Sequence, residues 1–484
     1  MRSYSIFTLL MIGFTVVTAQ FSGTALTEYQ YGKLPNEQDD MFNSVYSKLN
    51  LNYTLSQFKF GAGLQLYQSP FGERNYINLS QAKVSYQTKS VSVQLGNYNE
   101  ILGKGILLRN YEIPGAVIED RGFRSKQYFY TDMLGATASY KTDKWSGKVL
   151  WGYALNNLYP PTQIWERRRS DEVLGAEAGY TVGKQKIEFS GLRLKNDEEE
   201  SYYAMTGFSG TILPTLTYYL GYADYLGGEG KSSNEQEAFA IYGSLAFSLA
   251  NFGLSLEYKH YEHFLIGTGI NEPPALVREH SYKLLNRSTH VLQPTNESGI
   301  QLEAFYQPGL FSLLTFNYTY ARNRFVREFN YNEWFFEFSG VGIYDGDLKL
   351  FADYALDPLK NEDKRISAGF YMDSPLCKKW GLIVEGEGQK FERLDTHVQN
   401  YLLGLTIRNK SKFYLGLNTE WSNDRFVSES DKWWVGCSAR YKLNSKNSVQ
   451  LFVGERRGGP ACSAGVCYEV LDFKGMEIRW SARL

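Results

Sequence analysis

Seven cationic side chains on two stretches of the chain are the residues best suited to binding a ligand. Guanidinium groups hold carboxylate and phosphate in forked pairs, so a narrow pore lined by them would favour anions. A basic patch beside solvent or lipid phosphate is the alternative for the unbroken run at 167–169. The seven residues are Lys104, Arg109, Arg121, Arg124, Arg167, Arg168 and Arg169.

Two of the four cysteines are close enough in sequence to pair. Cys462 and Cys467 flank Ser-Ala-Gly-Val, just after the glycines at 458 and 459. In an oxidising compartment such a pair forms a disulfide that pins a loop tip. No histidine lies nearby, so we expect no metal site there, and we expect Cys377 and Cys437 to be unpaired.

Catalysis would require a histidine beside a serine or a carboxylate. Two of the five histidines, His280 and His290, share the stretch 264–297 with Glu279, Ser281 and Ser288, which is a weak constellation. We therefore expect neither enzymatic activity nor a cofactor.

The elements that would position these side chains are β-strands, and the end of the chain shows this most clearly. Successive side chains of a strand point to opposite faces. The alternation predicts a strand with one apolar and one polar face, which fits the closing strand of a membrane barrel. The apolar positions are Met476, Ile478, Trp480, Ala482 and Leu484, and Glu477, Arg479, Ser481 and Arg483 lie between them.

The same alternation recurs in pairs of runs joined by a few polar residues, which predicts a series of β-hairpins. Examples are 45–53 with 58–66, 134–140 with 149–153, 174–182 with 187–189, 239–249 with 254–258, 401–407 with 413–421, and 433–443 with 449–453.

Connections between the runs alternate between tight turns and longer segments, of which 100–125, 155–170, 264–297 and 457–472 are the longest. Outer-membrane barrels have short periplasmic turns and long extracellular loops. We therefore predict an all-β, antiparallel, up-and-down transmembrane barrel of about 24 strands, within a range of about 20 to 26. The competing architecture is a pair of secreted β-sandwiches, whose turn lengths need not alternate.

The start of the chain reads as a secretory signal peptide over residues 1–19, with a short positive start, an apolar run and small residues before Gln20. We expect residues 20–484 to form one barrel domain in the bacterial outer membrane. Its partners would be membrane lipid and lipopolysaccharide. The formal net charge of −1 and the absence of a long basic tract give no case for nucleic acid.

The barrel strands and loops use the whole mature chain, so no plug domain fits before the first strand. The loop 100–125 carries eight Ile, Leu and Val side chains, which is more apolar surface than a loop leaves in water. We expect it either to fold into the barrel, bringing its four cations near the pore, or to lengthen two strands above the membrane.

Two motifs carry a resemblance to a known family. They are the stretch from Gly103 to Glu112 and the cysteine loop from Glu455 to Cys467, with the ending through Gly475. Together they resemble a family of porin-like Bacteroidota outer-membrane barrel proteins to which no activity is assigned. The resemblance implies the fold and the location, and it carries over no functional residues.

These observations predict a monomeric, porin-like diffusion channel for small polar solutes, with anions and saccharides as the candidate solutes. The alternative is a sealed barrel that serves as a structural or docking component of an envelope protein complex.

Overall fold

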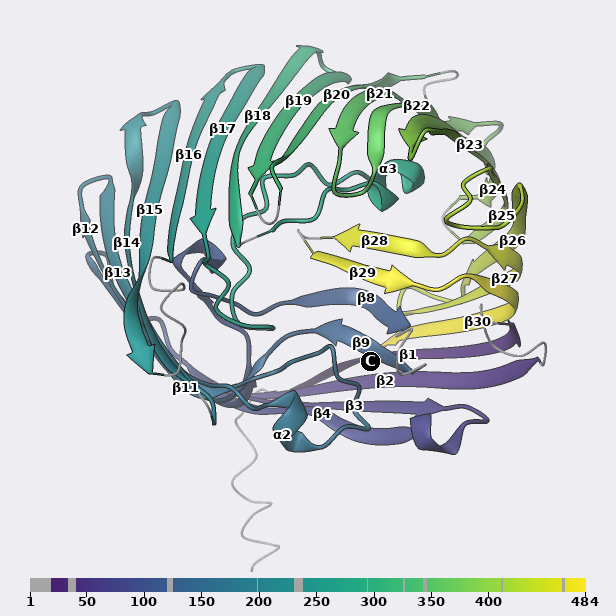
Figure 1. The fold of residues 1–484 in the computed structure, drawn as a ribbon. Coiled ribbons are helices and arrows are strands. Elements are labelled where there is room, and N and C mark those ends of the chain that lie inside the picture. Colours follow the sequence, from purple (N-terminus) through teal and green to yellow (C-terminus); the bar gives the residue numbers. More distant parts are fainter. Residues whose placement is uncertain are drawn as a thin grey trace, which may run out of the picture.

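The wall of the molecule is a single antiparallel sheet that curves round and closes on itself (Figure 1). This computed structural model describes residues 19–33, 41–119, 125–197, 199–229, 238–293, 295–324, 327–342, 346–410, 412–463 and 466–484. Within them, 24 strands form the wall, so the predicted barrel is confirmed and a pair of sandwiches is excluded. The predicted signal peptide lies outside the described residues, except for Ala19, where the first strand begins.

The wall strands are long enough to cross a membrane, since a tilted strand needs about 9–11 residues and only β5, with eight residues, is slightly shorter. The first twelve are β1 (Ala19–Lys33), β2 (Phe42–Leu55), β3 (Phe58–Gln68), β4 (Tyr76–Gln87), β5 (Val91–Tyr98), β10 (Met133–Lys141), β11 (Trp145–Ala154), β12 (Glu172–Val182), β13 (Gln185–Lys195), β14 (Glu200–Leu213), β15 (Leu216–Glu229) and β16 (Phe239–Leu249). The second twelve are β17 (Phe252–Glu262), β18 (Asn296–Gly309), β19 (Ser312–Asn323), β20 (Phe329–Val341), β21 (Asp347–Asp357), β22 (Glu362–Pro375), β23 (Trp380–Arg393), β24 (Thr396–Asn409), β25 (Phe413–Ser422), β26 (Lys432–Lys442), β27 (Asn447–Arg456) and β30 (Phe473–Arg483).

The last strand closes the barrel, as its alternation predicts. β30 pairs antiparallel with β27 on one side and with β1 on the other, where Tyr29 lies opposite Ile478 and Thr27 opposite Trp480. Every other wall strand pairs with the wall strands before and after it in the chain. Closure leaves no strand edge exposed to lipid, where unpaired backbone groups are costly.

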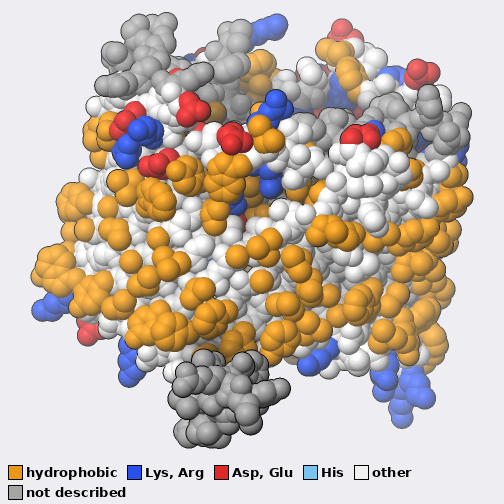
Figure 2. All heavy atoms as spheres, turned by 90° about the horizontal axis from the view of Figure 1, so that it is seen from below, with side chains coloured by type: hydrophobic (Ala, Val, Ile, Leu, Met, Phe, Trp, Pro, Cys, Tyr) orange, Lys and Arg blue, Asp and Glu red, His pale blue; other side chains and the backbone are white. Residues whose placement is uncertain are grey.

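Alternation separates an apolar outer face from a polar inner face. On β24, Leu403, Leu405 and Ile407 are exposed, whereas Asn400 and Leu402 on the other face are buried in the barrel. Figure 2 shows apolar side chains covering the middle of one side of the barrel, with charged side chains near its two edges. Lipid can cover such a belt, and water would make it costly. Among the described residues, no helix is long and apolar enough to cross a membrane.

The connections fall on two sides of the barrel, which we name the short-turn side and the long-loop side. Both ends of the described chain lie on the short-turn side, next to two- to five-residue turns such as 183–184 and 250–251. The predicted alternation of short and long connections is confirmed, but the connections on the long-loop side vary more in length than expected. β23 and β24 are joined there by two residues, 394–395, and β13 and β14 by 196–199.

The longest connections fold into the barrel and carry their own short elements. Figure 1 shows β8, β9, β28, β29 and α3 inside the ring of wall strands. These elements form separate two-stranded sheets, β6–β7, β8–β9 and β28–β29. The bounds are η1 (Gly72–Arg74), β6 (Ile101–Leu102), η2 (Gly103–Gly105), β7 (Leu108–Arg109), β8 (Glu112–Glu119), β9 (Lys126–Tyr130), α2 (Trp165–Arg168), α3 (Lys283–Arg287), β28 (Gly459–Ser463) and β29 (Val466–Val470).

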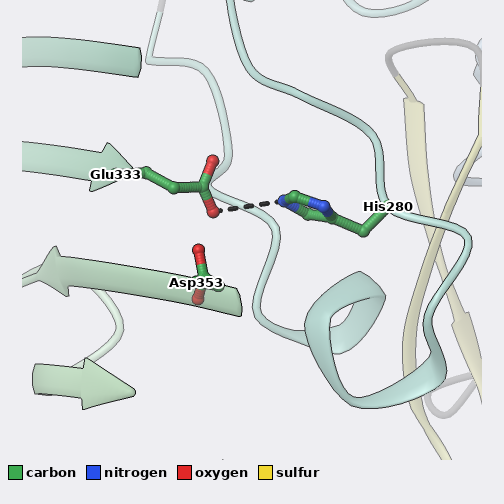
Figure 3. Close-up of side chains that lie close together, drawn as sticks. All are labelled: His280, Glu333 and Asp353. Atoms are coloured by element: carbon green, nitrogen blue, oxygen red, sulfur yellow. Dashed lines mark hydrogen bonds and ion pairs between the residues drawn. The ribbon is translucent and has the colours of Figure 1, made fainter. Parts of the chain in front are cut away.

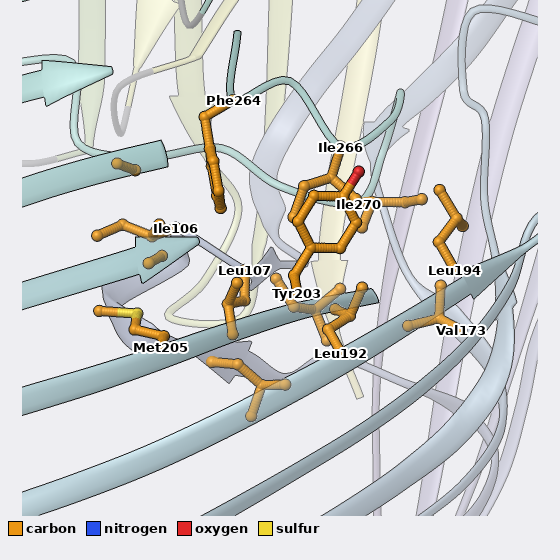
Figure 4. Close-up of a cluster of buried hydrophobic side chains, with 14 of the residues drawn as sticks. Ile106, Leu107, Val173, Leu192, Leu194, Tyr203, Met205, Phe264, Ile266 and Ile270 are labelled. Atoms are coloured by element: carbon orange, nitrogen blue, oxygen red, sulfur yellow. The ribbon is translucent and has the colours of Figure 1, made fainter. Parts of the chain in front are cut away.

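A hydrophobic core fills one side of the barrel interior, between the wall and the loop predicted at 100–125. Ile106, Leu107 and Leu108 have no exposed surface and belong to one cluster with inward side chains of β12 to β17, several of which Figure 4 shows. A Cβ on Gly103 would lie 2.1 Å from Met205 Sδ, so the loop approaches the wall closely. The inward fold is therefore the correct one of the two expected. The excursion is longer than predicted and runs from 99 to 132.

Candidate functional site

A row of carboxylates lines one sector of the inner wall, which we name the acidic wall. Its members sit at inward positions of five strands. Side chains alternate along a strand, and the neighbouring residue on each of these strands faces lipid. They are Glu257 on β17, Glu303 on β18, Glu337 on β20, Glu385 on β23 and Glu420 on β25.

The connection between β17 and β18 runs across this wall and binds it. We name residues 276–290 the strap. Lys283 Nζ lies 2.6 Å from Glu385 Oε1, and Arg287 Nη1 lies 2.5 Å from Glu420 Oε1. The strap also contributes an ion pair and a hydroxyl hydrogen bond to two further carboxylates, from Arg278 to Glu303 and from Tyr282 to Glu337, the latter at 2.7 Å. The strap therefore neutralises much of the acidic wall.

The helix of the strap is fixed by a wall carboxylate. The backbone N–H groups of Lys283 and Leu284, at the start of α3, donate to the two oxygens of Glu387 at 2.9 and 2.8 Å. The first N–H groups of a helix have no partner within the helix, and a carboxylate there also suits the helix dipole. A five-residue helix thus acquires one defined position inside the barrel.

Beneath the strap lies a fully buried charge cluster centred on Arg365 of β22. Its guanidinium contacts Glu333 at 2.9 Å, Glu362 at 3.1 Å and Asp353 at 3.2 Å. His280 of the strap contacts the same Glu333, with Nε2 to Oε1 at 3.2 Å. A buried charge is tolerated only when it is paired, so this cluster ties the strap to three wall strands.

The second strap histidine belongs to a neighbouring ion network. His290 Nδ1 lies 3.0 Å from Asp357 Oδ2, and its Nε2 lies 3.5 Å from Glu297, which also pairs with Lys259 at 2.5 Å. Burial alone would lower the pKa of His290, but the two carboxylates outweigh it and raise that pKa to about 9. Both histidines of the weak catalytic constellation thus contact wall carboxylates, and both anchor the strap.

A cavity of about 700 Å³ opens on the short-turn side, against a different sector of the wall. Five cations and one carboxylate, Glu112, line it together with many amide and hydroxyl groups. Lys48 pairs with Glu112 at 2.9 Å, and within the described part of the chain no ion pair involves the other four cations. We name this set the basic wall: Lys48, Arg440, Lys442, Lys446 and Arg483.

A second cavity, of about 640 Å³, lies on the long-loop side between the strap, β22 to β24, and the connections that follow β25 and β27. Arg287, Lys360, Arg393 and Arg457 line it, with three carboxylates. Most of these cations are already paired; Arg393, for example, lies 2.6 Å from Asp424. Burial lowers the pKa of Arg457, opposed by Glu420 at 2.9 Å.

The four cations of the predicted loop 100–125 do not share one position in the structure. Lys104 is exposed within the barrel, with Nζ 5.2 Å from the centre of the Tyr219 ring. Arg109 lies beside Glu272, whose pKa burial raises to about 7 while Arg109 opposes the rise. Arg121 and Arg124 lie outside the described residues.

The three arginines at 167–169 do not converge on one ligand position. Arg169 is buried and donates to Asp132 at 2.5 Å and to the Tyr153 carbonyl at 2.8 Å, so it holds its own loop. Arg168 donates to the Tyr159 carbonyl at 3.1 Å. Arg167 is exposed and contacts Gln163. None of the five described cations in the predicted set lines either of the two cavities described above.

The cysteine pair falls on the inward hairpin β28–β29. Cys462 and Cys467 are directly opposite each other in its register, and their side chains lie outside the described residues. Their disulfide therefore stays a prediction. Cys377 and Cys437 are free and exposed.

Neither the basic wall nor the strap is predicted from the sequence, because cations are recognised there only where they cluster in one loop. A signal does exist in the sequence, since Lys48, Arg440 and Lys442 occupy the polar positions of alternating strands. Their convergence depends on β2 and β26 being close, and that follows only from barrel closure.

A closed antiparallel sheet with an apolar exterior and a charged, loop-filled interior defines a transmembrane β-barrel. No protein-family model and no curated protein matches the chain. Solved structures similar to it include the P pilus usher (PapC) translocation pore, 9% identical over 96% of this chain and 99% of that one, with a TM-score of 0.49. Another is Pseudomonas aeruginosa OccK5 (OpdH), which is 12% identical over 81% of this chain and 98% of that one, with a TM-score of 0.41. A third is a BenF-like porin from Pseudomonas fluorescens Pf-5, which is 12% identical over 70% of this chain and 94% of that one, with a TM-score of 0.42. At these values the similarities carry no argument about function.

Proposed function

We propose that the protein is an outer-membrane channel for small polar solutes and that it prefers anions. The observation that carries the proposal is the basic wall. Four of its cations have no ion-pair partner among the described residues, and they face a cavity of about 700 Å³ at the short-turn mouth. Cations that line a confined aqueous space raise the local concentration of anions and lower that of cations.

The acidic wall does not cancel this preference. Four of its five carboxylates are bonded to the strap, from Arg278 at Glu303 to Arg287 at Glu420, and Glu257 accepts a hydrogen bond from Tyr242. A carboxylate that is already paired contributes little field to a passing ion. Of the two walls, it is therefore the basic one that presents unpaired charge to the cavity.

The alternative is a sealed barrel that docks other envelope proteins. It is favoured by the amount of chain inside the barrel, namely the strap, the excursion at 99–132 and the β28–β29 hairpin. The two functions differ in whether ions cross the protein.

Conductance of the purified protein in a planar bilayer tests the proposal. We expect stable ohmic steps and, in a KCl gradient, a reversal potential of the sign given by chloride permeation. Replacing Arg440, Lys442 and Arg483 together by Gln should lower the chloride-to-potassium permeability ratio by about threefold, because each screened charge contributes only a few tenths of a kcal/mol.

The matched control removes three cations elsewhere. Arg322, Lys364 and Arg425 face outward or lie on the long-loop rim, each paired with a carboxylate, so replacing them by Gln changes the formal charge equally. The ratio should then stay within experimental error. An equal fall in both variants would reject the basic wall as the selective element, and a silent bilayer would reject the channel in favour of the sealed barrel.

A further inference from the structure

Three potential metal ligands meet where the strap crosses the wall. His280 of the strap, Glu333 of β20 and Asp353 of β21 have ligand atoms within 4.8 Å of one another, the one such group of three in the described chain. Figure 3 shows the imidazole and the two carboxylates converging. Their side chains are at most 1% exposed. We propose that they bind a first-row divalent cation of the Zn²⁺ type, which fixes the strap to the barrel.

The spacing suits a metal at least as well as a hydrogen bond. His280 Nε2 and Glu333 Oε1 are 3.2 Å apart. Two ligands of a tetrahedral Zn²⁺, each about 2.0–2.1 Å from the metal, are about 3.3 Å apart. Asp353 is the third ligand, and its carboxylate lies within 4.8 Å of the ligand atoms of His280 and Glu333.

The charges around the site favour an added cation. Among the described residues, Arg365 is the one Lys or Arg side chain that forms an ion pair with Glu333 and Asp353, the two carboxylate ligands. One guanidinium group against two carboxylates leaves one negative charge when His280 is in the neutral form, which is the form that binds a metal.

The adjacent network around His290 shows that this excess is local. There, Glu297 and Asp357 are matched by Lys259 and a protonated His290, so the charges balance. Two buried strap histidines thus lie in different electrostatic settings. Only the setting of His280 calls for an added cation.

Three buried polar atoms of the site also lack a hydrogen-bond partner. They are Asp353 Oδ2, Glu333 Oε2 and His280 Nδ1, and such atoms are costly in a barrel interior. Asp353 uses its other oxygen to accept from Arg365 at 3.2 Å, so Oδ2 remains for a metal. Arg365 then acts as an outer partner that orients both carboxylates, as groups behind metal ligands commonly do.

The donor set indicates the metal. One imidazole and two carboxylates suit Zn²⁺, Co²⁺ or Mn²⁺ better than Mg²⁺ or Ca²⁺, which prefer oxygen ligands alone. Without a metal, a proton would have to supply the missing charge. The two possibilities differ in metal content, which can be measured.

The test uses the folded full-length protein, stripped with chelator and then equilibrated with Zn²⁺. We expect one zinc per chain by mass spectrometry, and, on loading with Co²⁺, absorption in the visible range typical of low-coordinate cobalt. His280→Gln and Asp353→Asn should each weaken zinc binding by about 100-fold or more, since each removes a direct ligand.

His290→Gln is the matched control, because it alters a buried, carboxylate-paired histidine of the same strap. Zinc binding should be unchanged in it. Only protein that resists unfolding by detergent at room temperature is counted, so a misfolded variant cannot mimic lost binding. Zinc below one tenth of an equivalent in the wild type, or equal losses in His280→Gln and His290→Gln, would overturn the proposal and leave a proton as the balancing charge.

Discussion

The acidic wall and the basic wall occupy the same barrel, face the same interior and arise from the same strand alternation, yet they serve different ends. The acidic wall is covered by the strap, and its carboxylates bind residues of the chain itself, as Lys283 and Glu385 show. The basic wall is open to a cavity, and Arg440 and Arg483 face it. The difference shows that an inward position is not enough for a charge to make a pore selective. The charge must also have no ion-pair partner.

The largest effect is expected from removing the strap, which covers the acidic wall. We expect replacement of residues 276–290 by a short Gly-Ser linker to raise single-channel conductance several-fold and to shift the reversal potential toward potassium, because at least five inward glutamates would then face the lumen.

A matched variant separates charge from space in that experiment. The same replacement combined with Glu303→Gln, Glu337→Gln and Glu385→Gln should keep the larger conductance and lose most of the cation preference. If both forms stayed anion-selective, the strap would not be what suppresses the effect of the acidic wall on ion selectivity.

The next test targets the cation on which the acidic sector depends. Arg365→Met should destabilise the barrel by about 3–5 kcal/mol, because it leaves Glu333, Asp353 and Glu362 buried beside one another without their shared partner. Its chain neighbour Lys364 forms an exposed pair with Glu392, and Lys364→Met should cost less than about 1 kcal/mol. Tryptophan fluorescence during denaturant unfolding measures both. Similar losses would show that burial under the strap does not set the value of these charges.

The smallest effect is expected from pH, acting on the strap alone. His290 has a pKa raised to about 9 in the folded protein, against about 6.5 when unfolded. A raised pKa means that the folded state holds the proton more tightly, so the stabilisation is fully present below about pH 6.5 and disappears as pH rises through about 9. It amounts to about 3 kcal/mol.

That pH dependence is measured as the denaturant midpoint between pH 6 and pH 10, in wild type and in His290→Gln. The wild type should lose stability over this range, and the variant should start lower and change less. A parallel fall in both would assign the change to other groups.

Sequence reasoning recovered the barrel because its evidence is local. Each hairpin, such as 401–407 with 413–421, shows its own alternation and its own turn, and the parity of the connections follows from counting hairpins. The inward fold of the loop 99–132 was one of two expectations, since its apolar content required burial but did not say where. Arg167, Arg168 and Arg169 are adjacent in sequence, but adjacent residues in and next to a helix such as α2 do not point at one ligand.

The sequence by itself determined which side chains face lipid and which face the interior, because that division depends only on odd and even positions along each strand. Only the tertiary structure decided which interior charges are neutralised. Arg287 meets Glu420 and Lys283 meets Glu385 across more than 100 residues of chain. Such contacts depend on the curvature of the closed sheet and on the path of the strap inside it, and no local pattern encodes either.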